Sequence, residues 1–114
     1  MGAVQRMGLE VQAPGDRGME PLRAVHPDRY LTFLQGIHDR WRRIEGASPE
    51  VIPNVHPASR TDGYPKSAVG QAGFHMTDTS CPIGPRTWAA AYASAQTAVE
   101  AAELVMAGDR AAYA

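Results

Sequence analysis

Two stretches of the chain place apolar residues at the three- and four-residue spacing of an amphipathic helix. In residues 20–45, Pro21 and Pro27 each suit a first helical turn, so the pattern predicts a short helix leading into a longer one. Residues 85–107 form the second predicted helix, with Pro85 at its first turn and Gly108 at its end. The expected apolar stripes are Tyr30, Leu31, Leu34, Ile37, Trp41 and Ile44 in the first, and Trp88, Tyr92, Ala95, Val99, Ala102 and Met106 in the second.

Two short segments favour β-strands. Leu9 and Val11 alternate with polar residues before Pro14-Gly15, which is typical of a short strand that ends in a turn. Residues 111–114, Ala-Ala-Tyr-Ala, follow Gly108-Asp109-Arg110, and we interpret them as the first residues of a strand.

Residues 46–85 show neither periodicity. Most of the nine prolines of the chain lie there, together with several glycines. The segment is therefore predicted to be a long Pro-rich loop. A connection of this length inside a compact domain is usually functional or disordered.

Composition and charge narrow the class of protein. With 11 basic and 12 acidic residues the net charge is -1, so we expect no nucleic-acid partner. No apolar run reaches the ~20 residues of a membrane span, and no signal-peptide pattern is present. One cysteine, Cys81, fits a reducing compartment, and we expect a cytoplasmic protein. Because Leu, Ile, Val and Phe together fall below roughly 20% of the chain, we expect it to need further protein around it.

Residues able to perform chemistry are sparse. No phosphate-binding loop, nucleophile elbow or paired-cysteine motif is present. His56, His75, Asp78 and Cys81 are metal-ligand types, but their spacing matches no established zinc site. We therefore favour a structural interpretation, in which these are loop residues and Asp78 forms an Asx turn.

Two hypotheses without hydrolytic chemistry stay open at this point. The first is a small helical interaction module, whose two amphipathic helices dock on a partner while the Pro-rich loop acts as a linker. The second is a small metal-binding protein that uses His56, His75 and Cys81.

The order of the segments resembles a known family. It consists of VHPDRYLTFL (Val25 to Leu34), a Pro-rich loop that ends in DTSCPIGPRTW (Asp78 to Trp88), an Ala-rich helix, and AGDRAAYA (Ala107 to Ala114). This arrangement is similar to the N-terminal part of the zinc-dependent histone deacetylase superfamily, and most of all to its bacterial acetylpolyamine amidohydrolases. The resemblance runs from near Val4 to Ala114.

The resemblance implies an α/β fold. Residues 1–114 would form an incomplete N-terminal part of the arginase/deacetylase-like three-layer α/β/α domain, mostly helical, with one or two short strands and the long loop 46–85. The implied function is that of an N-terminal fragment of a zinc-dependent amidohydrolase that acts on acetylpolyamine or acetyl-lysine.

In that family the zinc ligands, the general-base histidines and the catalytic tyrosine come after the position of Ala114. We therefore expect no catalytic and no metal-binding residue in this chain. Zinc belongs to the full-length family, and the chain alone is expected to be inactive.

The resemblance further implies that the 46–85 loop borders the entrance for the acetylated amine substrate. Its expected rim residues are Phe74, Asp78 and Ser80. The same loop would form a homodimer contact.

One departure from the family concerns the acidic residues that attract the substrate's ammonium groups. When the sequence is aligned on Gly70 and Thr87-Trp88, Val69 and Ser80 stand where the polyamine-acting branch has acids. Asp78 is the nearest remaining carboxylate, so the expectation of a polyamine preference is weakened.

Overall fold

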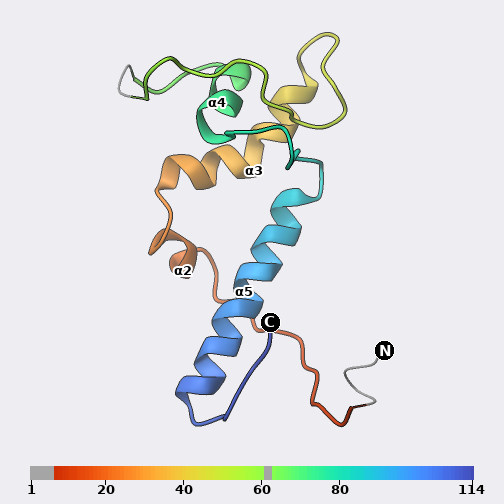
Figure 1. The fold of residues 1–114 in the computed structure, drawn as a ribbon, viewed down its shortest axis with the longest axis vertical. Helices are drawn as coiled ribbons and strands as arrows, with labels where there is room; N and C mark the ends of the chain where they lie inside the picture. Colours follow the sequence, from red (N-terminus) through yellow and green to blue (C-terminus); the bar gives the residue numbers. More distant parts are fainter. Residues whose placement is uncertain (1–6, 61–62) are drawn as a thin grey trace.

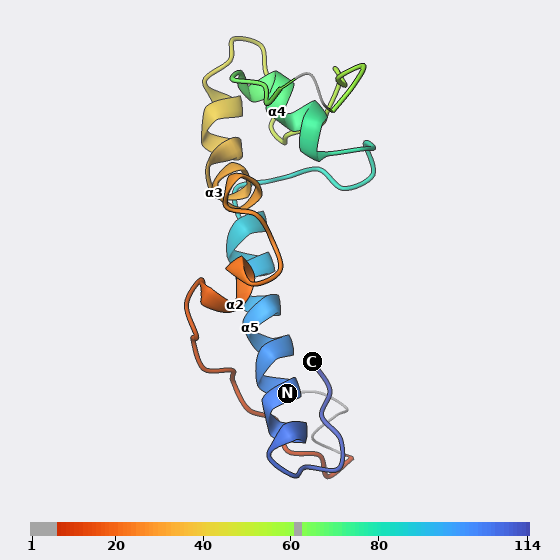
Figure 2. The ribbon, with the colours of Figure 1, turned by 90° about the vertical axis from the view of Figure 1, so that its left-hand side faces the viewer.

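The computed structural model describes residues 7–60 and 63–114 of the chain. Four helices lie within these residues: α2 (Glu20–Arg23), α3 (Asp28–Arg42), α4 (Ala68–His75) and α5 (Thr87–Met106). Helices α3 and α4 lie together at one end of the molecule, and α5 extends along the long axis toward the other end (Figures 1 and 2). The radius of gyration is 17.8 Å, well above the about 13 Å of a compact domain of this length. The chain is therefore elongated, with its core at one end.

The predicted break between a short and a long helix is confirmed. Pro27 has extended backbone angles and precedes the first turn of α3, while α2 has a proline in its own first turn. Asp28 in the first turn of α3 and Arg40 and Arg42 in the last turn all match the polarity of the helix dipole.

The buried face of α3 is wider than the predicted stripe. Phe33, which the spacing did not select, is 2% exposed, whereas Ile44 follows the end of the helix and is 38% exposed. Phe33 is buried because α4 packs across this side of α3. The core cluster consists of Phe33, Ile37, Trp41, Val51, Ala72 and Ile83.

Helix α4 corrects the prediction that residues 46–85 form a loop without secondary structure. The Ser67 side chain caps its first turn by accepting a hydrogen bond from the Gly70 amide at 3.0 Å. Gly70 and Gly73 lower the helix propensity of this segment, which explains why the sequence pattern did not show it. Tertiary packing overrides that propensity, since Ala72, Gly73 and Phe74 are all buried.

Outside α4, the described residues of the 46–85 segment are irregular but anchored. Val51 and Ile83 form an isolated antiparallel bridge, with hydrogen bonds of 2.8 and 3.1 Å between their backbone groups. Both side chains are buried in the core cluster. The Arg42 guanidinium donates to the carbonyls of Ala47 and Ser48, which fixes the chain where it leaves α3.

Neither predicted strand forms in the described part of the chain. Leu9 and Val11 lie in an irregular segment and are about half exposed, and Tyr113 is 99% exposed. A strand requires a backbone partner for its ladder, and neither segment has one among the described residues. The mostly helical character is confirmed, whereas the one or two expected strands were wrong for these residues.

Helix α5 contributes little to the core. Four residues of its predicted stripe, Trp88, Tyr92, Ala95 and Val99, are half-buried, and the last two, Ala102 and Met106, are exposed. The only α5 side chain that is fully buried is polar: Gln96, at 3% exposure. Its amide accepts from the Arg17 backbone N–H and donates to the Gly18 carbonyl, both at 2.9 Å. Gln96 therefore binds the backbone of segment 12–18 through one donor and one acceptor, as a neighbouring β-strand would.

Segment 12–18 is attached to α5 by charged groups as well. The Arg17 guanidinium bonds Glu100 at 2.5 Å and Glu103 at 2.6 Å, and Tyr92 donates to the Asp16 carboxylate. The hydrogen bond from Tyr92 is the largest cause that lowers the pKa of Asp16. Hydrogen bonds from Arg17 lower the pKa values of Glu100 and Glu103.

We expect acid to release segment 12–18 from α5. Since the folded-state pKa values of these three carboxyls lie below their ordinary values near 4, their contribution to stability is present above that range and is lost as the pH falls through the lowered pKa values. Amide-exchange protection at Arg17, compared at neutral pH and about pH 3, measures the release. The Arg17→Ala variant should show a weaker pH dependence, and equal protection of the parent chain at both pH values would contradict the prediction.

Within the described ranges no helix is both long and apolar enough to cross a membrane.

Candidate functional site

The candidate site is the exposed segment Thr77–Cys81, which we call the rim segment. It directly follows α4 and its C-cap Met76. The Asp78 carboxylate accepts a hydrogen bond from the Ser80 backbone N–H at 2.9 Å. This local bond confirms the predicted Asx turn and brings two of the expected rim residues, Asp78 and Ser80, together on the surface.

The third expected rim residue, Phe74, lies beneath the surface. It belongs to the last turn of α4 and is 2% exposed. The Tyr64 ring contacts it edge-on at 5.1 Å, and the guanidinium groups of Arg29 and Arg60 lie 4.9 and 4.3 Å from its ring centroid. Phe74 is therefore a buried residue rather than an exposed rim residue, and cations from two other parts of the chain hold its ring.

His75 completes this aromatic cluster. Its ring lies 4.4 Å from that of Phe33, and a hydrogen bond of 2.7 Å joins its Nε2 to the Tyr64 hydroxyl. Burial, and then the positive charges of Arg29 and Arg60, lower the pKa of His75 to about 4. The imidazole is therefore uncharged at neutral pH. Burial also raises the pKa of Tyr64, which keeps its hydroxyl protonated.

The candidate metal ligands do not meet. His56 bonds the Gly73 carbonyl through Nδ1 at 3.0 Å, His75 bonds Tyr64, and Cys81 is an exposed free thiol. Over residues 7–60 and 63–114, no group of three or more His, Cys, Asp or Glu side chains could hold a metal ion. The described residues therefore give the small metal-binding hypothesis no ligand set, and they do not fit a zinc centre.

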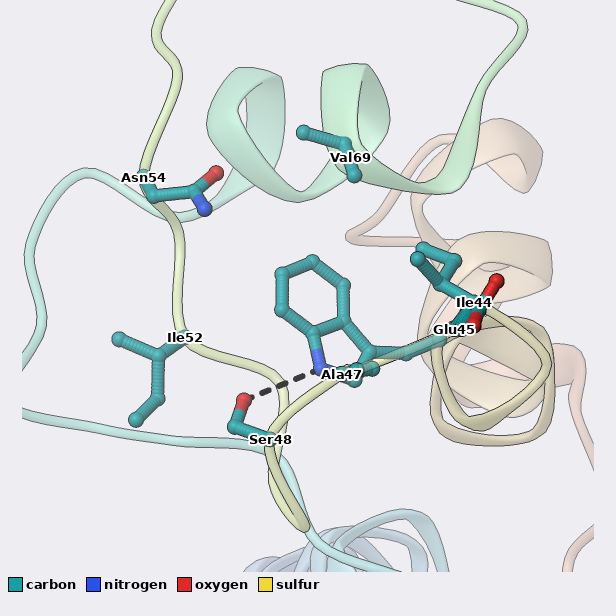
Figure 3. Close-up of a pocket in the computed structure, with 9 residues that line it drawn as sticks. Ile44, Glu45, Ala47, Ser48, Ile52, Asn54 and Val69 are labelled. Atoms are coloured by element: carbon teal, nitrogen blue, oxygen red, sulfur yellow. Dashed lines mark hydrogen bonds between the residues drawn. The ribbon is translucent and has the colours of Figure 1, made fainter.

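A cavity of about 380 Å³ lies where α3 ends, and three separate parts of the chain line it. Ile44 and Glu45 lie on one side of it, Ile52 on the other, and Val69 of α4 above them (Figure 3). The Trp41 Nε1–H donates to the Ser48 hydroxyl at 3.2 Å. Sequence periodicity could not predict this cavity, because its wall combines a helix end, the loop and α4.

A larger groove, of about 1010 Å³, lies at the other end of the molecule. Segment 9–14, the second half of α5 and residues 109–113 line it. Its walls are mostly apolar, and Leu9, Val11 and Tyr113 are exposed there.

Comparison with known proteins gives a consistent result. The chain is 40% identical over 115 residues to an acetylpolyamine amidohydrolase of Burkholderia pseudomallei, and this match covers 100% of the chain and 33% of that relative. It is 42% identical over 113 residues to acetylpolyamine amidohydrolase 1 of Pseudomonas aeruginosa, which covers 96% of the chain and 32% of the relative. No family model matches the chain.

A solved structure agrees with the sequence relatives. The crystal structure of acetylpolyamine aminohydrolase from Burkholderia pseudomallei superposes with a TM-score of 0.84 at 38% identity, over 94% of this chain and 31% of that chain. The chain thus spans about a third of the length of the relatives it matches. In sequence and in fold, the chain resembles a part of the acetylpolyamine amidohydrolases, which belong to the histone deacetylase superfamily.

Proposed function

We propose that this chain supplies about a third of an enzyme that hydrolyses the amide bond of acetylated amines, with acetylpolyamines as the first substrate class and acetyl-lysine as the second. The observation that supports this most is the 40% identity across the whole chain to an acetylpolyamine amidohydrolase. The TM-score of 0.84 to a solved member adds that the shared residues adopt the same arrangement.

The part of the reaction that we assign to these residues is access, not bond cleavage. The described residues offer no ligand set for zinc, so no catalytic step is assigned to them. We propose that the 46–85 segment, through its rim segment Thr77–Cys81, borders the substrate entrance and forms a homodimer contact. The surface exposure of the rim segment is consistent with this role.

The charge of the proposed entrance bears on the substrate class. Asp78 is the carboxylate of the rim segment, and one of its oxygens already accepts the Ser80 N–H. Arg29 and Arg60 are exposed residues whose positive charges flank Phe74, just before the rim segment. Because a cation is attracted less to a region of mixed charge than to an acidic one, we propose weak selection for highly charged polyamines.

A chimaeric enzyme tests the proposed function. The matching third of the Burkholderia pseudomallei acetylpolyamine amidohydrolase is replaced by this chain, and hydrolysis of an acetylated diamine is measured with zinc present. We expect turnover by the chimaera and none by the 114-residue chain alone, because the chain has no metal centre of its own among its described residues.

Two controls make the result interpretable. The unmodified Burkholderia enzyme sets the reference activity, and circular dichroism shows whether the chimaera is folded. A folded, zinc-loaded chimaera without turnover would contradict the proposal and favour the interaction-module hypothesis. Turnover by the purified chain alone would also contradict it.

A further inference from the structure

Three consecutive carbonyls at the end of α4 are satisfied in three different ways. A helix leaves its last four carbonyls without partners inside the helix. Here the Ala72 carbonyl accepts from the Met76 N–H at 2.8 Å, the Gly73 carbonyl bonds His56 Nδ1 at 3.0 Å, and the Phe74 carbonyl accepts from Arg60 Nη1 at 2.6 Å. Two of the three partners are side chains of the 53–60 segment, which is remote from α4 in the sequence.

The backbone of that segment touches α4 directly. A Cβ added at Gly73 would lie 1.5 Å from the Val55 carbonyl oxygen and 3.2 Å from the His56 Cα. Only glycine permits this approach, and the approach brings the His56 ring within reach of the Gly73 carbonyl. The contact is therefore built into the sequence at position 73.

Arg60 contacts Phe74 in two ways. Its guanidinium stacks 4.3 Å from the Phe74 ring centroid while it donates to the Phe74 carbonyl. A charged donor to a helix C-terminal carbonyl is also favoured by the helix dipole. Arg60 thus fixes both the backbone and the side chain of the residue that precedes His75, Met76 and the rim segment.

The other end of the rim segment is fixed as well. After Cys81 and Pro82, Ile83 pairs with Val51 through two backbone hydrogen bonds. The exposed residues Thr77–Cys81 therefore span two fixed points, the α4 C-terminus and the Val51–Ile83 bridge. The conformation of a span this short depends on how firmly each end is held.

We propose that Arg60 and His56 are positioning residues, which clamp the end of α4 and thereby set the conformation of the rim segment at the substrate entrance. That the rim segment lies at a substrate entrance rests on the proposed function. The clamp itself rests on the contacts to Gly73 and Phe74.

The lone cysteine offers a direct probe of the clamp. Cys81 is exposed and lies in the rim segment, so a nitroxide attached to it reports the mobility of that segment by electron paramagnetic resonance. In the full 114-residue chain, Arg60→Ala should increase label mobility while the helix content measured by circular dichroism stays unchanged. Arg60→Lys should restore part of the order, because lysine keeps the charge and one donor group. His56→Ala should increase mobility less than Arg60→Ala.

The matched control is Arg43→Ala, which removes an exposed arginine at the C-cap of α3. It should leave label mobility unchanged. A label that is equally mobile in the parent chain and in Arg60→Ala would overturn the proposal, as would an equal effect of Arg43→Ala.

A kinetic measurement connects the clamp to the substrate entrance. In the chimaeric enzyme, Arg60→Ala should raise KM for the acetylated diamine severalfold with kcat little changed, since the substituted residue acts on access. Arg60→Lys should raise KM less than Arg60→Ala does. A change in kcat alone would overturn the positioning role. If the parent chimaera does not turn over at all, the proposed function fails, while the spin-label result still decides whether the clamp exists.

Discussion

Replacing Gly73 by alanine is expected to destabilise the chain by about 3 kcal/mol or more, at the upper end of what overpacking costs. The added methyl group would lie 1.5 Å from the Val55 carbonyl oxygen, and a backbone atom cannot move aside as a flexible side chain can. Since small domains are stable by only about 5–15 kcal/mol, the loss is a large part of the total. Urea unfolding followed by circular dichroism measures it.

Gly36 provides the matched control for this substitution. It lies in the interior of α3, and a Cβ built there has nothing within 4 Å. Gly36→Ala should therefore stabilise the chain by roughly 0.5–1 kcal/mol, because alanine is the better helix former. The two substitutions are chemically identical but opposite in expected sign. Similar effects of the two would show that the Val55 backbone does not press on α4 as described.

The second large effect is expected at Trp41. Its side chain is 5% exposed within the core cluster, so Trp41→Ala should cost about 3–5 kcal/mol of unfolding free energy. Trp41→Phe keeps much of the buried area and loses the hydrogen bond to the Ser48 hydroxyl, which should cost about 1 kcal/mol for that bond. Unfolding monitored by circular dichroism applies to both variants.

Trp88 is the comparison residue for Trp41. It lies half-buried in the first turn of α5, outside the core cluster. Trp88→Ala should therefore cost clearly less than Trp41→Ala. An equal loss at both positions would contradict the conclusion that the core lies at the α3–α4 end of the molecule.

The two long helices were predictable because their determinants are local. Pro27 sets the start of α3, and the apolar spacing through Ile37 and Trp41 identifies its buried side. The predicted end was three residues late, because Ile44 continues the spacing after the helix has ended at Arg42. Periodicity marks the apolar side of a helix better than its last residue.

Helix α4 was missed because its stability comes from remote partners. Gly73 counts against a helix in any local reading, yet the Val55 backbone requires a glycine there. Phe33 was missed from the core for the same reason, since its burial depends on α4. In both cases the deciding contact lies far away in the sequence and has no local sign.

In the candidate site, too, locally determined features could be predicted and those that depend on remote contacts could not. The Asp78 turn was predictable, because its hydrogen bond spans only two residues. The burial of Phe74 was not, because Arg29 and Arg60 reach its ring from separate segments. The comparisons support the resemblance to the acetylpolyamine amidohydrolases, whereas the rim roles of Phe74, Asp78 and Ser80 stay predictions.

The way Gln96 binds segment 12–18 has a consequence for how this part of the molecule can vary during evolution. Its amide recognises the main chain of residues 17 and 18 and makes no demand on the side chain at position 17. A substitution of Arg17 would therefore remove the ion pairs with Glu100 and Glu103 but keep the hydrogen bonds between the Gln96 amide and the backbone of residues 17 and 18. Position 96 does not tolerate substitution in this way, because no other side chain of that length offers a donor and an acceptor side by side.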